Sequence, residues 1–306
     1  MEVKNKFENA LIVECELGGP HSGSAMAGRA FFSQFDKQIN VVDTIKTPIR
    51  EIRKSNTPDA HYLKDINSCL RDISEAVVNH YENTPDTRLL VIAGDHSTAS
   101  GTLAGLQTAY PNKTIGTIWI DAHADIHSPY TSPSGNVHGM PVAAAASDDH
   151  IAFMQNNIDD ETRALWEETK DICRKTINYD NLVYIGIRDL EKVEWDIIKE
   201  HGISYYSVST VESTDSAKLC DLILRKLDNC DLIYISFDID SLDKSIVPGT
   251  GTPVDNGLSL ESTKKLLSLL CKNEKIKILE VVEINPLLDS YNKTATTISK
   301  MISEVI

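Results

Sequence analysis

The sequence lacks the features that would place it in several specialised protein classes. Its six cysteines show no CxxC or zinc-finger spacing, so we expect reduced, mainly structural thiols rather than a disulfide framework. No apolar run reaches the length that spans a membrane, and no basic stretch followed by an apolar one opens the chain. We therefore expect a cytoplasmic protein without a membrane partner.

Positive charge is also scarce. The 306 residues contain 30 Lys and Arg against 45 Asp and Glu, which gives a formal net charge of −15. Nucleic-acid binding requires clustered Lys and Arg to contact phosphates, so this balance argues against a nucleic-acid partner. An acidic protein instead draws cations towards its clefts, so the charge suits a cationic ligand.

Short apolar runs rich in Val and Ile alternate with amphipathic segments along the chain. Near-continuous apolar runs are typical of parallel strands buried on both faces. The expected strands cover residues 10–16, 39–45, 88–94, 114–121, 181–187, 203–207, 231–240 and 275–284. The expected helices cover residues 63–81, 99–110, 216–227 and 260–272. This alternation predicts a parallel sheet covered by helices, and the absence of a linker or repeat predicts one domain over residues 1–306.

Acidic and histidine side chains follow four of the expected strands. They are Asp95, His96, Asp121, His123, Asp125, Asp238, Asp240 and Glu283. Ligands of open parallel sheets bind outside the carboxyl ends of the strands. The four segments are therefore expected to point their polar side chains into one crevice.

The spacing of these residues indicates a metal centre. In DAHAD (121–125) and DID (238–240) the polar residues are two apart, and in extended chain such residues share a face. Burying several carboxylates together is costly unless cations compensate them. The expected ligands are His96, Asp121, His123, Asp125, Asp238 and Asp240. Carboxylates with imidazoles and no thiolate favour Mn²⁺, with Co²⁺ and Ni²⁺ as competitors, and six ligands suit two ions with a bridging hydroxide as nucleophile.

Each motif taken alone has a simpler interpretation. An Asp-x-His step after a strand is commonly a cap or a turn, and Asp-His-Ser at 95–97 suits a helix N-cap. Residues 236–243 alone could be a turn or a calcium-like loop. We favour the metal interpretation because all three motifs lie at expected strand ends of one chain.

The ordered motifs resemble those of the ureohydrolases, the arginase and agmatinase family. They are AGDHS (93–97), DAHADIH (121–127), SGNVHG (134–139), SFDIDSLDKSIVPGTGTPV (236–254) and EVVEINP (280–286), in family order. The resemblance covers residues 88 to 290 and implies the arginase fold, a three-layer α/β/α arrangement with a mainly parallel eight-stranded sheet. It also implies a dinuclear manganese site. One departure is Ala93, which stands where the family usually has Gly.

The resemblance implies a role for each ligand. One Mn²⁺ would be held by His96, Asp121, Asp125 and Asp238, and the other by His123, Asp121, Asp238 and Asp240. Asp121 and Asp238 would bridge the two ions. Asp125 would also hold the bridging hydroxide and pass its proton to the departing amine.

Three further residues match the reaction site of the family. Glu283 would pair with the substrate guanidinium, and Thr252 would line the guanidinium site. His138 would relay protons at the mouth of the cleft. The simpler alternatives are a surface acid at a strand end for Glu283 and an ordinary loop histidine for His138.

The loop TSPSGN (131–136) resembles the arginase form rather than the agmatinase form. In arginases its side chains receive the α-carboxylate of the substrate, which points to the hydrogen-bond donors of Ser134 and Asn136. Glu191 and Glu194 match the acids that face the α-amino group, although Glu191 replaces the usual Asp and Glu194 could be a solvated charge on a helix. His127 replaces an Asn that helps to bind the carboxylate in many arginases, and a histidine can still donate from its ring.

The resemblance therefore implies hydrolysis of L-arginine to L-ornithine and urea by attack of the bridging hydroxide on the guanidinium carbon. Agmatinase, guanidinobutyrase and formiminoglutamase activities are the alternatives, since these enzymes share the metals and differ in the pocket for the substrate tail. A deacetylase-like amidohydrolase would use one zinc ion and fewer acids. A metal-binding scaffold without activity is the non-enzymatic alternative, and a missing ligand would be its hallmark. Family members are often trimers or hexamers, so a homo-oligomer is expected.

Overall fold

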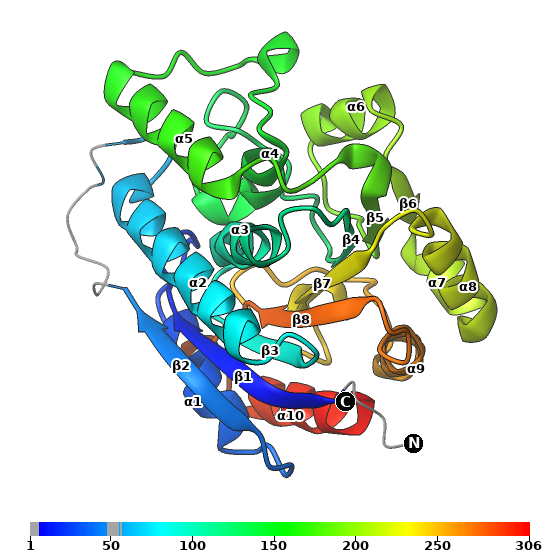
Figure 1. The fold of residues 1–306 in the computed structure, drawn as a ribbon. Coiled ribbons are helices and arrows are strands. Elements are labelled where there is room, and N and C mark those ends of the chain that lie inside the picture. Colours follow the sequence, from blue (N-terminus) through cyan, green and yellow to red (C-terminus); the bar gives the residue numbers. More distant parts are fainter. Residues whose placement is uncertain (1–5, 48–54, 56) are drawn as a thin grey trace.

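The computed structural model describes residues 6–47, 55 and 57–306. Eight strands form one sheet in the order β2-β1-β3-β8-β7-β4-β5-β6, and all neighbouring strands are parallel (Figure 1). The strands are β1 (Phe7–Glu14), β2 (Asn40–Lys46), β3 (Arg88–Ala93), β4 (Ile115–Ile120), β5 (Leu182–Ile185), β6 (Ser204–Tyr206), β7 (Leu232–Asp238) and β8 (Ile276–Val282). Each of the eight predicted strands overlaps an observed one, so the prediction of a parallel eight-stranded sheet is confirmed.

Helices cover both faces of the sheet. They are α1 (Ala27–Phe32), α2 (Leu63–Asn83), α3 (Ala99–Ala109), α4 (Pro141–Ala146), α5 (Asp160–Cys173), α6 (Lys192–Glu200), α7 (Val208–Ser213), α8 (Ser216–Lys226), α9 (Leu260–Leu270) and α10 (Lys293–Val305). On one face α2 packs against α3 and α5, and on the other α9 packs against α8 and α10 (Figure 1). This arrangement confirms the predicted three-layer α/β/α fold.

The central strands are buried on both faces. In β3, Leu89 and Val91 belong to the core cluster shared with α2 and α3, whereas Leu90 and Ile92 belong to the cluster shared with α9 and α10. Successive strand residues point to opposite faces, so both sets must be apolar. This is why the strands read as unbroken apolar runs in the sequence.

The predicted helix set did not include α4 and α6, which lie near the polar motifs. All six residues of α4 are buried, so its sequence PVAAAA shows no polar face and no helical periodicity. Helix α6 has only nine residues and buries Glu194 in its first turn, which interrupts the apolar pattern. Helix α4 owes its place to tertiary packing, whereas α6 also has a local signal, the capping box of Glu191 and Glu194, that the prediction did not use.

The four strands that end in polar motifs are neighbours at the centre of the sheet, in the order β3-β8-β7-β4. Because they are parallel, their carboxyl ends meet at one edge. The two outer pairs, β2-β1 and β5-β6, flank this block. The fold therefore gathers the motifs at one place.

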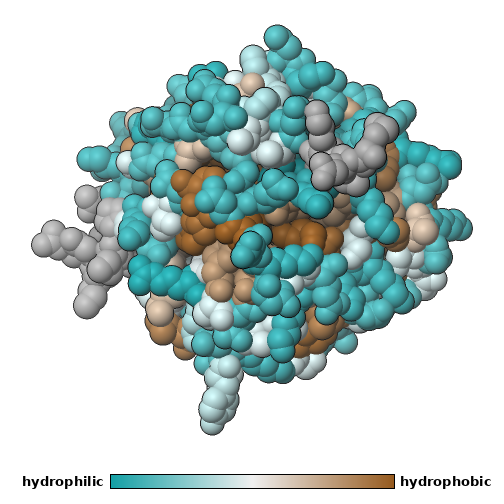
Figure 2. Space-filling model, turned by 60° about the horizontal axis from the view of Figure 1, so that its bottom comes forward, coloured by the Kyte–Doolittle hydropathy of each residue, from teal (hydrophilic) through white to brown (hydrophobic). Residues whose placement is uncertain are grey.

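The face of the molecule drawn in Figure 2 is mostly hydrophilic. Figure 2 turns the lower side of Figure 1 forward and shows a band of hydrophobic surface across it. The edge strand β2 exposes Val41 and Val42, and it also carries Asp43 and Lys46. Charged side chains on an edge strand oppose edge-to-edge pairing with another sheet. Among the described residues, no helix combines the length and the apolar character needed to cross a bilayer.

Candidate metal centre

The His96 ring is held firmly behind the carboxyl end of β3. Asp95 caps the short helix η2 (His96–Thr98) by accepting a hydrogen bond from the backbone of Ser97 at 3.0 Å. The imidazole of His96 stacks on Trp119 with 4.2 Å between ring centroids, and its Nε2 lies 2.6 Å from Oγ of Ser236. These contacts orient Nδ1 towards the motifs of β4 and β7.

Three carboxylates surround Nδ1 of His96. It lies 3.1 Å from Oδ2 of Asp121, 2.9 Å from Oδ2 of Asp125 and 3.2 Å from Oδ2 of Asp238. Nevertheless this buried nitrogen has no hydrogen-bond partner in the described part of the chain. Two ligands about 2.1 Å from one cation and at right angles are about 3 Å apart. The donor atoms of His96, Asp121 and Asp238 are compact enough to share one divalent ion, and these residues fit such an ion, whereas Asp125 contacts His96 but lies outside this compact group.

A second group lies beside the first. Nδ1 of His123 is 3.5 Å from Oδ1 of Asp121 and 3.2 Å from Oδ2 of Asp240. Asp121 thus presents one oxygen to each histidine, the arrangement required of a bridging ligand. Asp238 differs, because its Oδ1 accepts the backbone N–H of Asp240 at 2.8 Å while its Oδ2 faces His96. Clusters of His96, Asp121 and Asp238 and of Asp121, His123 and Asp240 are each compact enough to hold a metal ion.

The cluster concentrates negative charge in a buried volume. Asp121, Asp125, Asp238 and Asp240 are all less than a tenth exposed. Burial, together with the charge of Asp121, raises the pKa of Asp125 to about 6. Burial and the charge of Asp240 raise the pKa of Asp238 well above its ordinary value. A divalent cation relieves this repulsion, which is a second reason why the donor set fits a metal.

Glu283 follows β8 and lies beside the cluster. It is 3% exposed, so the alternative of a surface acid does not hold. Its Oε1 accepts the backbone N–H of His96 at 2.9 Å and lies 3.2 Å from Nδ1 of His138. Glu283 and Asp125 both have left-handed backbone conformations, with φ of 68° and 50°. Such conformations are unfavourable for these residues and persist where the surrounding structure enforces them.

A cavity of about 110 Å³ opens next to the cluster. It is lined by His123, Asp125, His127, Ser132, Pro133, Ser134, Asn136, His138, Gly139, Glu191, Glu194 and Thr252. Thr252 donates a hydrogen bond to Oδ2 of Asp240 at 3.0 Å, so it joins the cavity wall to the ligand set. The structure thus brings all the predicted substrate-binding residues to the same cavity.

His127 has partners at both ring nitrogens. Nδ1 lies 3.0 Å from Oγ1 of Thr131, and Nε2 lies 3.1 Å from Oε2 of Glu191 and 3.8 Å from Oε2 of Glu194. The histidine expected to contact a carboxylate of the substrate therefore contacts carboxylates of the chain. A substrate carboxylate would have to share Nε2 with Glu191 or displace it.

Glu191 and Glu194 form the capping box that opens α6. Glu194 accepts the backbone N–H of Glu191 at 3.0 Å and is 3% exposed, so it is not a solvated charge on the helix. The hydrogen bonds from His127 and Glu194 lower the pKa of Glu191 to about 2. Burial raises the pKa of Glu194 well above its ordinary value. The pKa values of the two acids of the capping box are thus shifted in opposite directions.

Residues 13–306 match the Arginase family. The chain belongs to this family. The arginase of Emericella nidulans is 32% identical to it, over 92% of this chain and 86% of that protein, and the arginase of Bacillus subtilis is 33% identical over 89% and 86%. The solved Entamoeba histolytica arginase in complex with L-ornithine matches with a TM-score of 0.84 and 27% identity, covering 98% of this chain and 99% of that one. The chain is thus an arginase-family hydrolase with candidate metal-binding His/Asp clusters.

Three residues that were not predicted from the sequence support the candidate ligands of this arginase-family site. Ser236 contacts His96, Trp119 donates from Nε1 to Asp121 at 3.0 Å, and Asp189 lies 3.6 Å from Nε2 of His123. Ser236 and Trp119 each stand two positions before a ligand Asp, so strand periodicity places them on the same face. That signal was present in the sequence. Asp189 lies after β5 and carries no comparable signal.

Proposed function

We propose that this arginase-family hydrolase converts L-arginine to L-ornithine and urea with two Mn²⁺ per chain. The observation that carries the proposal is the composition of one cavity. Its deep end reaches the carboxylate–histidine cluster, and its rim combines Ser134 and Asn136 with the charge of Glu191. A substrate with a cationic guanidinium at one end and an amino-acid group at the other matches the two ends of this cavity.

The ligand set supports two ions. One would be held by His96, Asp121, Asp125 and Asp238, and the other by His123, Asp121, Asp238 and Asp240. Two divalent cations supply Lewis acidity and a water-derived nucleophile at neutral pH. The compact spacing around His96 Nδ1 and the two-sided position of Asp121 favour this assignment.

Protein side chains carry out the remaining steps of the reaction. Asp125 accepts a proton from the attacking water and returns it to the departing amine. Glu283 binds the guanidinium, and we assign this contact to Oε2 because Oε1 accepts from His96 and faces His138. His138, whose side chain is 17% exposed, exchanges protons between the amine and bulk water. One water and one arginine thus give one ornithine and one urea.

The rim determines which substrate is accepted. Ser134 and Asn136 donate hydrogen bonds to the α-carboxylate, and Glu191 faces the α-amino group. His127 acts at the same end, because its Nε2 pairs with Glu191 and an incoming carboxylate would share this nitrogen with Glu191 or displace it. Agmatine lacks the carboxylate and would leave these donors without a partner.

Urea release from L-arginine, agmatine and 4-guanidinobutyrate tests the substrate. Each hydrogen bond to a charged group contributes about 1.5–3 kcal/mol, so kcat/KM for arginine should exceed that for agmatine by at least about ten- to a hundred-fold. A preference for agmatine or guanidinobutyrate would reject arginase activity while leaving the family assignment intact. Hydrolysis of N-formiminoglutamate in their place would favour a formiminoglutamase.

Metal removal tests the mechanism. Activity should disappear on chelation and return with Mn²⁺ in proportion to the manganese bound, up to two ions in the dinuclear centre. Reloading with Mg²⁺ serves as the control, because imidazole ligands favour Mn²⁺ over Mg²⁺. Full turnover by protein that contains one ion or none would refute the two-metal mechanism.

A further inference from the structure

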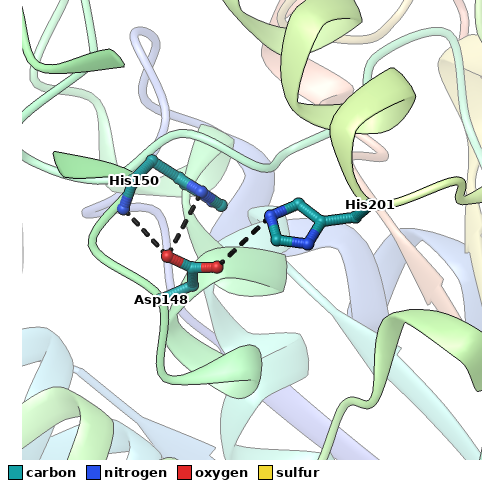
Figure 3. Close-up of side chains that lie close together, drawn as sticks. All are labelled: Asp148, His150 and His201. Atoms are coloured by element: carbon teal, nitrogen blue, oxygen red, sulfur yellow. Dashed lines mark hydrogen bonds and ion pairs between the residues drawn. The ribbon is translucent and has the colours of Figure 1, made fainter. Parts of the chain in front are cut away.

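Asp148, His150 and His201 converge outside the candidate metal centre (Figure 3). Asp148 and His150 follow α4, and His201 is the residue that ends α6. The carboxylate lies between the two imidazoles, with Oδ1 3.3 Å from Nδ1 of His150 and Oδ2 3.6 Å from Nε2 of His201. One donor atom of each residue lies within 4.8 Å of the other two.

The three side chains are held in place yet accessible from solvent. The side chain of His150 is 1% exposed, whereas those of Asp148 and His201 are 31% and 32% exposed. The backbone N–H of His150 donates to Oδ1 of Asp148 at 3.0 Å. His150 also has a left-handed backbone with φ of 53°, which is unfavourable for a histidine. The cluster is therefore preorganised, with an entry path along its exposed members.

The protonation states of the side chains in the cluster suit the binding of a metal cation. Burial lowers the pKa of His150 to about 4, so its imidazole is neutral at neutral pH and able to bind a metal. The hydroxyl of Tyr179 lies 3.5 Å from Oδ2 of Asp148 and 3.4 Å from Nε2 of His150, and burial raises the pKa of this phenol. Tyr179 thus stays protonated and can donate to the carboxylate, as residues behind metal ligands commonly do.

We propose that Asp148, His150 and His201 form a mononuclear site for a borderline divalent cation, with Zn²⁺ as the best match. Two imidazoles and one carboxylate are a common ligand set for Zn²⁺, and water can take the fourth tetrahedral position. The four buried carboxylates of the dinuclear centre instead favour a harder ion such as Mn²⁺. The two sites thus differ in the ion that they prefer.

The site would join two segments that border the substrate cavity. Asp149, next to Asp148, accepts a hydrogen bond through its backbone carbonyl from Ser128 at 2.7 Å, in the loop that follows the DAHADIH motif. His201 lies at the opposite end of α6 from Glu194, which lines the cavity. An ion held here would fix α6 against this loop. It would also stabilise the folded chain, because the unfolded chain cannot assemble the same ligand set.

Zinc uptake by protein already loaded with Mn²⁺ tests the proposal. After free Mn²⁺ has been removed, titration with Zn²⁺ followed by elemental analysis should show one Zn²⁺ per chain with both Mn²⁺ retained. Anomalous scattering at the zinc edge should place the ion between Asp148, His150 and His201. Thermal unfolding should shift to higher temperature with added Zn²⁺.

Variants distinguish zinc binding at this cluster from zinc binding elsewhere on the protein. Tyr179→Phe removes only the hydroxyl that contacts the proposed ligands and should weaken Zn²⁺ binding about 10–100-fold. His201→Asn and Asp148→Asn remove a ligand each and should weaken it further. His21→Asn replaces an exposed histidine outside the cluster and should leave zinc uptake unchanged.

Equal zinc uptake by the wild type, His201→Asn and Asp148→Asn would overturn the proposal and leave the cluster as a hydrogen-bonded support. Zinc that enters only by displacing Mn²⁺ would overturn it as well. Circular dichroism of each variant establishes that a loss of binding does not reflect unfolding. Because uptake is measured without substrate, this outcome is independent of whether the enzyme hydrolyses arginine.

Discussion

Nδ1 of His138 lies 3.2 Å from Oε1 of Glu283, and the same oxygen accepts the backbone N–H of His96 at 2.9 Å. His138, which follows the loop at 131–136, and His96, a candidate metal ligand at the end of β3, are thus linked through the carboxylate of Glu283 at the end of β8. In the proposed mechanism, this contact would give a proton released at the metal centre a route to His138, whose side chain is 17% exposed. The contact would thus connect His138, the proposed proton relay, to Glu283, the residue proposed to bind the guanidinium.

We predict that His138→Ala lowers kcat without abolishing turnover. A positioned proton relay contributes roughly 10²–10⁴-fold, and water or buffer replaces it in part. Steady-state kinetics over a range of pH, with and without added imidazole, measure the effect. An unchanged kcat at every pH would show that His138 is not a relay.

His127→Ala should act on substrate binding rather than on chemistry. The carboxylate end of the substrate has the same charge in the ground and transition states, so a contact there changes KM and leaves kcat nearly constant. A hydrogen bond to a charged group is worth about 1.5–3 kcal/mol, so KM for arginine should rise about ten- to a hundred-fold. Any activity on agmatine should change little. His61→Ala, which alters a half-buried histidine outside the cavity lining, is the control, and an equal fall in kcat on both substrates would assign His127 to the proton relay instead.

Ser236→Ala should weaken metal binding without touching a ligand. The hydroxyl of Ser236 lies 2.6 Å from Nε2 of His96 and fixes the ring so that Nδ1 faces the carboxylates. Removal of such a partner typically costs 10–100-fold in metal affinity. The Mn²⁺ dissociation constant measures this effect. Ser299→Ala, at another buried serine, is the matched control, and equal affinities in the two variants would contradict the role of Ser236.

His80 should make stability depend on pH. Burial and nearby Lys277 lower the pKa of His80 to about 4 from an ordinary value of 6.5. Between these values the unfolded chain binds a proton that the folded chain does not, so stability falls as the pH drops from about 6.5 to 4. His80→Gln should lose less stability over this window than the wild type. Urea denaturation at pH 7 and pH 5 compares them, and a stability difference that is the same at both pH values would reject the prediction.

Gly135→Ala should disturb the substrate loop. Gly135 has φ of 69°, and a Cβ there would lie 2.0 Å from the carbonyl oxygen of Pro58. Strain of this kind costs of order 1–3 kcal/mol, and movement of Ser134 and Asn136 should also raise KM. Gly202→Ala is the matched control, because Gly202 also has a positive φ, of 61°, but lies outside the cavity lining, and a Cβ there meets no atom within 4 Å. Equal stability and KM in the two variants would mean that the loop tolerates the change.

The sequence by itself determined the parts of this protein that depend on local periodicity. Unbroken apolar runs predicted the eight strands, because strands buried on both faces need apolar side chains in both directions. The two-residue spacing of Asp121, His123 and Asp125 predicted that they share a face. Their position directly after a strand predicted the edge of the sheet at which they lie.

The tertiary structure decided which of these parts meet. Strand β8 lies between β3 and β7, far from its place in the sequence, and only this order brings Glu283 to the backbone of His96. No local pattern encodes strand order, because it follows from how the helical layers pack on the whole sheet. The same long-range packing places Glu191 beside His127 and Asp148 beside His201, although 52 residues lie between Asp148 and His201 in the chain. Side-chain partners separated this far in sequence are set by the fold, whereas strand faces are set by the residue order itself.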